Sequence, residues 1–379
     1  MSVVEQPRFA GAIRYETIGA WRGIACLAVV VFHSFGAFYH TPIWAPLKPL
    51  RALSEFGWLG LHLFFVISGY CIFERLAAAK RHGETTRNFW LDRALRVLPG
   101  YWIALAASIA LSLAAWPFNT TPLLANLPRS LAAGLADLSL THVFLGLPAY
   151  ILVSWTLACE VAFYFLAGLM LWTARRTGAG LTAAFGLGAV LCVPGMFLSS
   201  AGWSLVLAAW PDFFAGVCVS FLLRSVHQRD WRLTGAGIAA LAALTALTLL
   251  NVGSYGSDAR KFSVGFAWVL FGLHWCDAWL ARLLLVRALA WIGVFSYSLY
   301  LVHVQVLTRV INLGGRVLLP TSPFFAALWV GAVGVAITAG WLFWRLVENR
   351  AEQYRHGRRR MLLQQRPFST VVAPVAGSP

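Results

Sequence analysis

The chain has 379 residues, of which 59% are hydrophobic and only 12% are charged, and its mean hydropathy is +0.71. Soluble domains carry about 25% charged residues, so this composition excludes a soluble globular protein and indicates an integral membrane protein. The net charge of +16 reflects mainly membrane topology and contact with anionic lipid head groups, and no soluble basic module that would bind nucleic acid is found.

Apolar windows close to the length of about 20 residues that spans a bilayer recur along the chain. They lie at residues 18–38, 57–75, 98–116, 151–173, 179–199, 203–223, 233–252, 262–281, 288–308 and 324–344. We therefore expect an all-α polytopic membrane protein with about ten transmembrane helices in one bundle. Residues 1–17 are expected to form a cytoplasmic N-terminal segment, residues 18–346 the membrane domain, and residues 347–379 a basic, disordered cytoplasmic tail.

The distribution of basic residues predicts the orientation of the bundle. If the N-terminus is cytoplasmic, 23 of the 30 Lys and Arg residues fall on the inner side, which the positive-inside rule favours. Both termini are therefore expected in the cytoplasm, with an even number of helices. The first apolar run follows a polar head and lacks a small-residue cleavage site behind it, which indicates a signal anchor.

The first apolar segment carries two residues that are costly in hydrocarbon, Arg22 and His33. Eleven residues at about 100° each complete about three helical turns, so both side chains share one helix face about 16 Å apart. An ionisable residue inside a membrane indicates a functional site, because its charge must face a partner, a cavity or a ligand.

Two further titratable residues lie at a depth similar to that of His33. Glu160 follows Ser154-Trp155-Thr156-Leu157 about nine residues from the outer end of its segment, and His303 lies about 15 residues from the inner end of its own. We expect His33, Glu160 and His303 to contribute to one site. For His303 alone, a helix-packing hydrogen bond is the simpler interpretation. His62 and Asp212 lie nearer the outer ends of their segments, where snorkelling is equally plausible.

The cysteines show no metal-binding or disulfide spacing. All six fall in apolar segments without a Cys-x-x-Cys pair, so we expect neither a metal site nor a disulfide framework.

An ordered set of motifs along residues 20–350 resembles the acyltransferase-3 family of membrane acyltransferases. The motifs are Arg22-x10-His33, the Leu63–Tyr70 run, Phe89–Trp102, Ser154–Leu157 with Glu160, Phe213–Gly216, Ser296–His303 and Glu348. Two positions depart from the family pattern. His62 stands where an Asp is common, and Glu160 is followed by Val161 where a second acidic residue often follows.

The resemblance implies transfer of an acyl group, usually acetyl, from acyl-CoA to a hydroxyl of a saccharide such as O-antigen or exopolysaccharide. It also implies functional roles for Arg22, His33, Arg93 and Arg96. No tightly bound cofactor is expected, because acyl-CoA is a co-substrate that arrives from the cytoplasm. The glycan acceptor is expected at the outer face of a multi-pass protein in the bacterial cytoplasmic membrane, in contact with membrane lipids.

A mechanism can be assembled on these positions. Arg93 and Arg96, with Arg87 as a further donor, are expected to bind the phosphates of CoA. His33 is expected to act as the general base, and Glu160 to orient its imidazole. Spacing leaves open whether Arg22, Tyr297 or Ser68 stabilises the leaving thiolate. Direct transfer is favoured over an acyl-enzyme, with an acyl-histidine left open.

The sequence also offers four supporting residues and leaves one alternative function open. His303, Ser68, Tyr297 and Trp155 are expected to contact substrate or to support the catalytic residues. The alternative function is a polytopic transporter or flippase for a glycolipid or small polar solute, in which intramembrane Arg, His and Glu form a proton relay. A transporter more often shows repeated halves with matching helix breaks, and none is evident in this chain.

Overall fold

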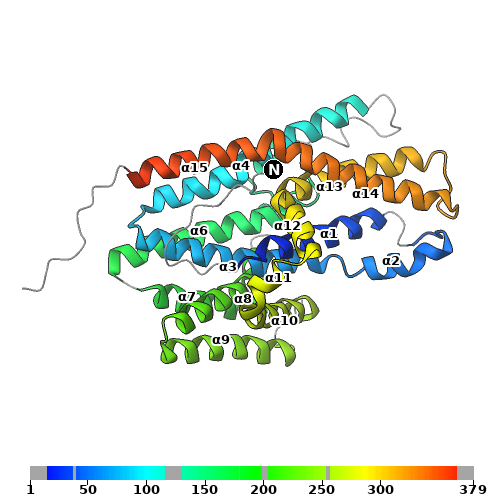
Figure 1. The fold of residues 1–379 in the computed structure, drawn as a ribbon. Helices are drawn as coiled ribbons and strands as arrows, with labels where there is room; N and C mark the ends of the chain where they lie inside the picture. Colours follow the sequence, from blue (N-terminus) through cyan, green and yellow to red (C-terminus); the bar gives the residue numbers. More distant parts are fainter. Residues whose placement is uncertain are drawn as a thin grey trace, which may run out of the picture.

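A computed structural model of the protein describes residues 15–36, 40–115, 130–178, 180–198, 204–252 and 257–364. Within these ranges every regular element is a helix, as the sequence predicts. Most of the helices lie lengthwise beside one another in one bundle (Figure 1). The longer helices are α1 (Ile18–Phe35), α3 (Leu59–Arg81), α4 (Thr86–Ala115), α6 (Ser154–Thr177), α7 (Leu181–Phe197), α8 (Ser204–His227), α9 (Trp231–Leu249), α10 (Ser257–Leu273), α12 (Leu284–Val294), α13 (Ser296–Gly314), α14 (Phe324–Phe343) and α15 (Asn349–Gln364).

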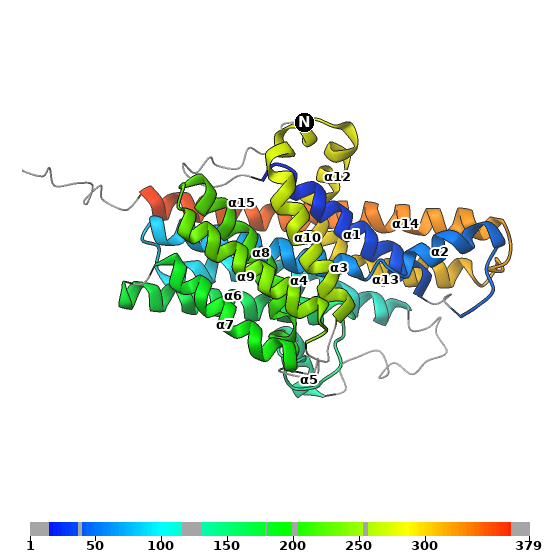
Figure 2. The ribbon, with the colours of Figure 1, turned by 90° about the horizontal axis from the view of Figure 1, so that it is seen from below.

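Short helical elements connect several of these helices. They are η2 (Ala45–Leu47), α2 (Lys48–Ser54), α5 (Leu131–Leu138), η5 (His274–Cys276), α11 (Asp277–Leu280) and the π-helical turn η6 (Trp344–Glu348). α10 departs from the common direction and crosses the line of α14 and α15 steeply (Figure 2).

Seven helical stretches in the described residues are long and apolar enough to cross a membrane, and one bent pair can supply an eighth. The seven are Ile18–Phe35, Ala45–Arg81, Thr86–Ala114, Ser154–Thr177, Ser204–His227, Trp231–Leu249 and Phe324–Leu362. These helices fit the multi-pass membrane protein that the composition predicts. The count of ten stays a prediction, because α7 and other apolar segments fall short of a full straight span.

The predicted span at residues 288–308 is wrong as a single helix. It contains the end of α12 and the start of α13, which are separated at Phe295, and α12 is itself bent by 108° from the α10–α11 stretch. Hydropathy does not reveal this break because the residues on both sides are apolar. α12 presses directly on α1, since a Cβ built on Gly293 would lie 1.8 Å from the carbonyl oxygen of Gly19.

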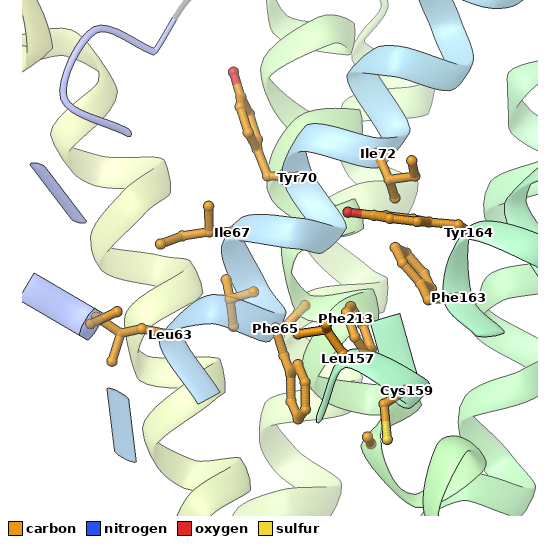
Figure 3. Close-up of a cluster of buried hydrophobic side chains, with 14 of the residues drawn as sticks. Leu63, Phe65, Ile67, Tyr70, Ile72, Leu157, Cys159, Phe163, Tyr164 and Phe213 are labelled. Atoms are coloured by element: carbon orange, nitrogen blue, oxygen red, sulfur yellow. The ribbon is translucent and has the colours of Figure 1, made fainter. Parts of the chain in front are cut away.

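The centre of the bundle is the contact between α3 and α8. A Cβ at Gly69 would lie 1.9 Å from the carbonyl oxygen of Phe213, so the two backbones touch, as small residues permit in membrane helices. Phe65 and Phe163 pack on the ring of Phe213 with centroids 4.6 and 4.3 Å away (Figure 3). This packing fixes α6 against α3 and therefore positions the next residue along α6, Tyr164, beside α3.

The helix α15 occupies residues that composition assigned to a disordered tail. It lies along α4 (Figure 1), where Arg355 donates to Asp92 at 3.3 Å and Arg358 donates to Asn88 at 3.1 Å. These partners are more than 260 positions apart in the sequence, so composition could not reveal them. The expectation of disorder is corrected for residues 349–364, and residues 365–379 lie outside the described ranges.

Candidate active site

A polar cavity of about 150 Å³ lies between α1, α3, α4, α6 and α13. Its walls combine side chains from the motifs that the sequence analysis singled out. The polar lining residues are Arg22, Ser68, Cys71, Arg93, Arg96, Thr156, Glu160, Tyr164, Ser296, Tyr297 and Tyr300. The apolar lining includes Leu61, Phe64 and Ile72. These walls combine guanidinium groups, which bind anions, with apolar side chains, which contact uncharged groups.

Glu160 is held in this cavity by two hydroxyl groups. Ser68 Oγ donates to Glu160 Oε1 at 3.2 Å, and the hydroxyl of Tyr164 donates to the same oxygen. Because Tyr164 lies one turn along α6 and Ser68 comes from α3, the carboxylate links these two helices. Both hydroxyls donate to one carboxylate oxygen and so fix the orientation of the side chain.

Arg93 and Arg96 line the cavity from the same face of α4, as their spacing predicts. Arg93 donates to Asp92 at 2.5 Å and lies over the ring of Tyr164. Arg96 donates to Glu348 at 2.9 Å and also to Glu352. A guanidinium has five N–H donors, so these contacts fix each group while leaving donors for a ligand. Arg87 is exposed and does not line the cavity, so its predicted place in the site is not supported.

The carboxylates that hold these arginines escaped the sequence analysis. Asp92 accepts from Arg75 at 3.3 Å as well as from Arg93 and Arg355, and Glu348 also accepts from Ser298 at 2.5 Å. Glu348 was quoted as part of a motif, but no role followed from its position. The docking of α15 and η6 on α4 adds Arg355 and Glu348 to these contacts.

Arg22 differs from the other two arginines of the cavity. It lines the cavity from α1, and among the described residues it forms no ion pair and no side-chain hydrogen bond. The hydroxyl of Tyr297, by contrast, is occupied, because it donates to the carbonyl oxygen of Val97 at 2.6 Å. Of the three groups proposed for the leaving thiolate, Arg22 has its donors available, whereas Ser68 and Tyr297 already donate elsewhere.

His33 and His303 form a hydrogen-bonded pair next to the cavity. His33 Nδ1 lies 3.3 Å from His303 Nε2, and the ring centroids are 5.1 Å apart. Neither ring lines the cavity, but Tyr300 does, and its ring lies 5.7 Å from that of His303. Tyr300 therefore borders both the histidine pair and the charged cavity.

The acyltransferase-domain model of the acyltransferase-3 family matches residues 15–345, which is nearly the whole chain. The chain belongs to the acyltransferase-3 family. Membership in this family of enzymes favours an acyltransferase over the transporter or flippase that the sequence left as an alternative.

Two curated relatives from this family match the chain. The peptidoglycan O-acetyltransferase OatA of Listeria monocytogenes is 25% identical over 328 residues, which cover 77% of this chain and 49% of that protein. The acyltransferase MdmB of Streptomyces mycarofaciens is 28% identical over 399 aligned residues, which cover 96% of each chain. The chain therefore spans about half the length of the Listeria relative. No solved structure matches the chain.

The structure divides the predicted acyltransferase-3 site into two neighbouring parts. His33 is paired with His303, whereas Glu160 binds Ser68 and Tyr164 and makes no contact with His33. The expectation that Glu160 orients the His33 imidazole is therefore corrected. Equal depth in the membrane did not place the three groups together, because α6 presents Glu160 to α3 rather than to α1. Trp155 packs against the hydrophobic core and does not line the cavity.

Two other buried polar groups lie outside the cavity. His62 and Asp212 form a pair at 2.8 Å between α3 and α8. Ser154 Oγ lies 3.3 Å from His142 Nε2, and His142 Nδ1 lies 3.5 Å from Asp137. The second group has the residue types of a hydrolase triad, but its members are 0%, 1% and 2% exposed, so a substrate has no access to them. Its evident role is to fasten α5 to the start of α6.

Proposed function

We propose that the protein transfers an acyl group, most often acetyl, from cytoplasmic acyl-CoA to a hydroxyl of a saccharide acceptor. The observation that carries this proposal is the cavity in which Arg22, Arg93 and Arg96 meet next to the His33–His303 pair. Membership in the acyltransferase-3 family supports the acyl transfer. Identification of the donor as acyl-CoA rests on the clustered guanidinium groups, which suit its phosphates.

The donor enters from the cytoplasmic side in this proposal. Arg93 and Arg96 bind its phosphates with the N–H groups that Asp92 and Glu348 leave available. The pantetheine arm then extends along the apolar wall toward Tyr300, and the thioester lies beside His33. The spacing of about 16 Å from Arg22 to His33 suits an extended pantetheine chain.

The chemical step is a direct substitution at the thioester carbonyl. The acceptor oxygen forms a bond with the carbonyl carbon while His33 Nε2 takes the hydroxyl proton, a role worth about 10²- to 10⁴-fold in rate. The carbon–sulfur bond then breaks, and the proton on His33 passes to the sulfur to give the free thiol of CoA. Arg22 lies about 16 Å from His33 along α1, so it does not reach the leaving sulfur and instead adds a positive charge to the phosphate site of Arg93 and Arg96.

A saccharide acceptor and an outer-face site complete the proposal. The relative OatA is named a peptidoglycan O-acetyltransferase, which supports a glycan hydroxyl as the acceptor class. We place both termini in the cytoplasm, with about ten spans in the bacterial cytoplasmic membrane, because 23 of 30 basic residues then lie inside.

The test is transfer of label from radiolabelled acetyl-CoA into glycan in vesicles with matched expression of the wild-type protein and His33→Ala. We expect label that depends on His33, released from the product by mild alkali as an ester. Absence of transfer with acetyl-, succinyl- and longer acyl-CoA, in vesicles supplied with glycan, would contradict the proposed donor. Equal transfer by both proteins would contradict the role of His33.

A further inference from the structure

The protonation of the buried His303 is determined by its surroundings. Its Nδ1 lies 2.8 Å from the carbonyl oxygen of Tyr300 and 3.2 Å from that of Leu299. A carbonyl oxygen can only accept a hydrogen bond, so Nδ1 must carry the proton. His303 is 0% exposed, and a second proton would place an uncompensated charge in the bundle. Its Nε2 is therefore a lone-pair acceptor, and that atom faces His33.

The same reasoning determines the tautomer of His33. Its Nδ1 lies 3.0 Å from the carbonyl oxygen of Val29 and 3.3 Å from His303 Nε2, and both of these partners are acceptors. The Nδ1 atom of His33 must therefore be the protonated nitrogen, which donates to both. The lone pair of His33 is on Nε2, the opposite side of the ring, where a general base needs it.

We propose that His303 is a positioning residue that does for His33 what a carboxylate does in a hydrolase triad. This inference rests on the proposed function, in which His33 is the general base. When His33 takes the acceptor proton on Nε2, its Nδ1–H becomes a stronger donor, and His303 Nε2 stabilises the resulting imidazolium. A neutral acceptor achieves this without placing a permanent negative charge in the membrane.

The groups that surround the histidine pair are uncharged or are bound to other partners, so the imidazolium of His33 depends on His303 for its acceptor. Among the described residues, no carboxylate, lysine or arginine forms an ion pair or hydrogen bond with either ring. The uncharged ring of Phe32 lies 5.1 Å from that of His33, and Trp329 of α14 donates to Ser34 rather than to a histidine. On α13, Arg309 donates to Gln305 and to Ser112 of α4. Glu160 of α6 is bound on the cavity side by Ser68 and Tyr164.

The test compares pH–rate profiles of acetyl transfer for the wild-type protein, His303→Gln and His303→Leu in vesicles. Leu fills similar space but cannot accept, so we expect kcat to fall by about 10- to 100-fold, less than the loss of about 10²- to 10⁴-fold expected when the general base itself is removed. The acidic limb of the pH–rate profile of His303→Leu should move to lower pH, because the imidazolium of His33 loses its acceptor. Gln offers an amide oxygen near the position of Nε2, so it should restore most of the rate and the original limb. The KM for acetyl-CoA should stay unchanged in both variants.

His227→Leu is the matched control. His227 makes the same contact with a carbonyl one turn back, at 2.7 Å to Leu223, and its ring lies 5.4 Å from another histidine, His274, away from the site. Its pH profile should match that of the wild-type protein. If kcat and the acidic limb are unchanged in His303→Leu while His33→Ala is inactive, the role of His303 is overturned and the proposed function is not. An active His33→Ala would instead overturn the proposed function on which it rests.

Discussion

At the scale of single residues, the sequence identified the charged groups better than their partners. Arg22 and Glu160 are singled out because hydrocarbon does not tolerate them, and Arg93 and Arg96 because of the family resemblance. All four line one cavity. Their partners could not be predicted, because a hydrogen bond depends on helix rotation rather than on depth. That is why Glu160 was assigned to His33 and is instead bound to hydroxyl groups of α3 and α6.

Arg22 provides the first prediction at this scale. It has no described ion-pair partner, so in the proposed site its charge is available to the phosphates of the donor. Arg22→Gln should raise the KM for acetyl-CoA by about 10- to 100-fold, since a hydrogen bond to a charged group contributes about 1.5–3 kcal/mol. Arg22→Lys keeps the charge and should recover part of the affinity. Steady-state kinetics in vesicles measure both variants, and a KM within twofold of wild type for Arg22→Gln would contradict this role.

At the scale of secondary-structure elements, α15 shows where the sequence stops being informative. Its residues have the composition of a solvated tail, yet Arg355 and the neighbouring η6 residue Glu348 connect it to α4. The sequence predicts helices between residues 18 and 344 because apolar runs of about 20 residues are typical of membrane-spanning helices. A polar helix fixed by ion pairs gives no such signal, and neither does a break inside an apolar run such as the one at Phe295.

The ion pair of Arg96 with Glu348 is the next prediction. Glu348 is 2% exposed and shares its carboxylate between Arg96 and Ser298, so Glu348→Gln should destabilise the protein by about 1.5–3 kcal/mol, the range for hydrogen bonds to charged groups. Glu352→Gln, at a carboxylate that is 29% exposed, should cost less than about 1 kcal/mol. Thermal unfolding in detergent micelles compares the two variants. A larger loss of stability for Glu352→Gln than for Glu348→Gln would contradict this prediction.

The fastening of α5 to α6 predicts a dependence on pH. Burial lowers the pKa of His142 in the folded segment. In the unfolded segment the imidazole binds a proton near pH 6.5, whereas in the folded segment it does so only at a lower pH. The stability contribution of His142 is therefore present above about pH 6.5 and lost as the pH falls below it. Hydrogen exchange in residues 131–154, corrected for intrinsic rates, should be faster at pH 5.5 than at pH 7.5.

The variant His142→Gln isolates this effect. Burial raises the pKa of Asp137, so its contribution runs in the opposite direction and grows as the pH falls. Without His142, acidification should leave protection of residues 131–154 unchanged or increase it. If the variant still lost protection at pH 5.5, another group would be responsible.

At the scale of the whole molecule, the fold brings motifs from five helices to one cavity. The sequence predicted the helical class and the convergence of these motifs, because their order resembles that of a family which matches residues 15–345. It could not predict the division into a charged cavity and a histidine pair. Tyr300 lies between these two parts of the site, and its ring looks like ordinary packing in a sequence.

The central claim, that this cavity binds cytoplasmic acyl-CoA, is tested most directly with Cys71. This exposed thiol lines the cavity, whereas the exposed Cys276 in η5 does not and serves as the internal control. A non-reactive thioether analogue of acetyl-CoA, added to inside-out vesicles, should protect Cys71 but not Cys276 from a maleimide, as quantified by mass spectrometry. The same analogue should give no protection in right-side-out vesicles, because it cannot cross the membrane. Equal labelling of Cys71 with and without the analogue in inside-out vesicles would contradict the claim.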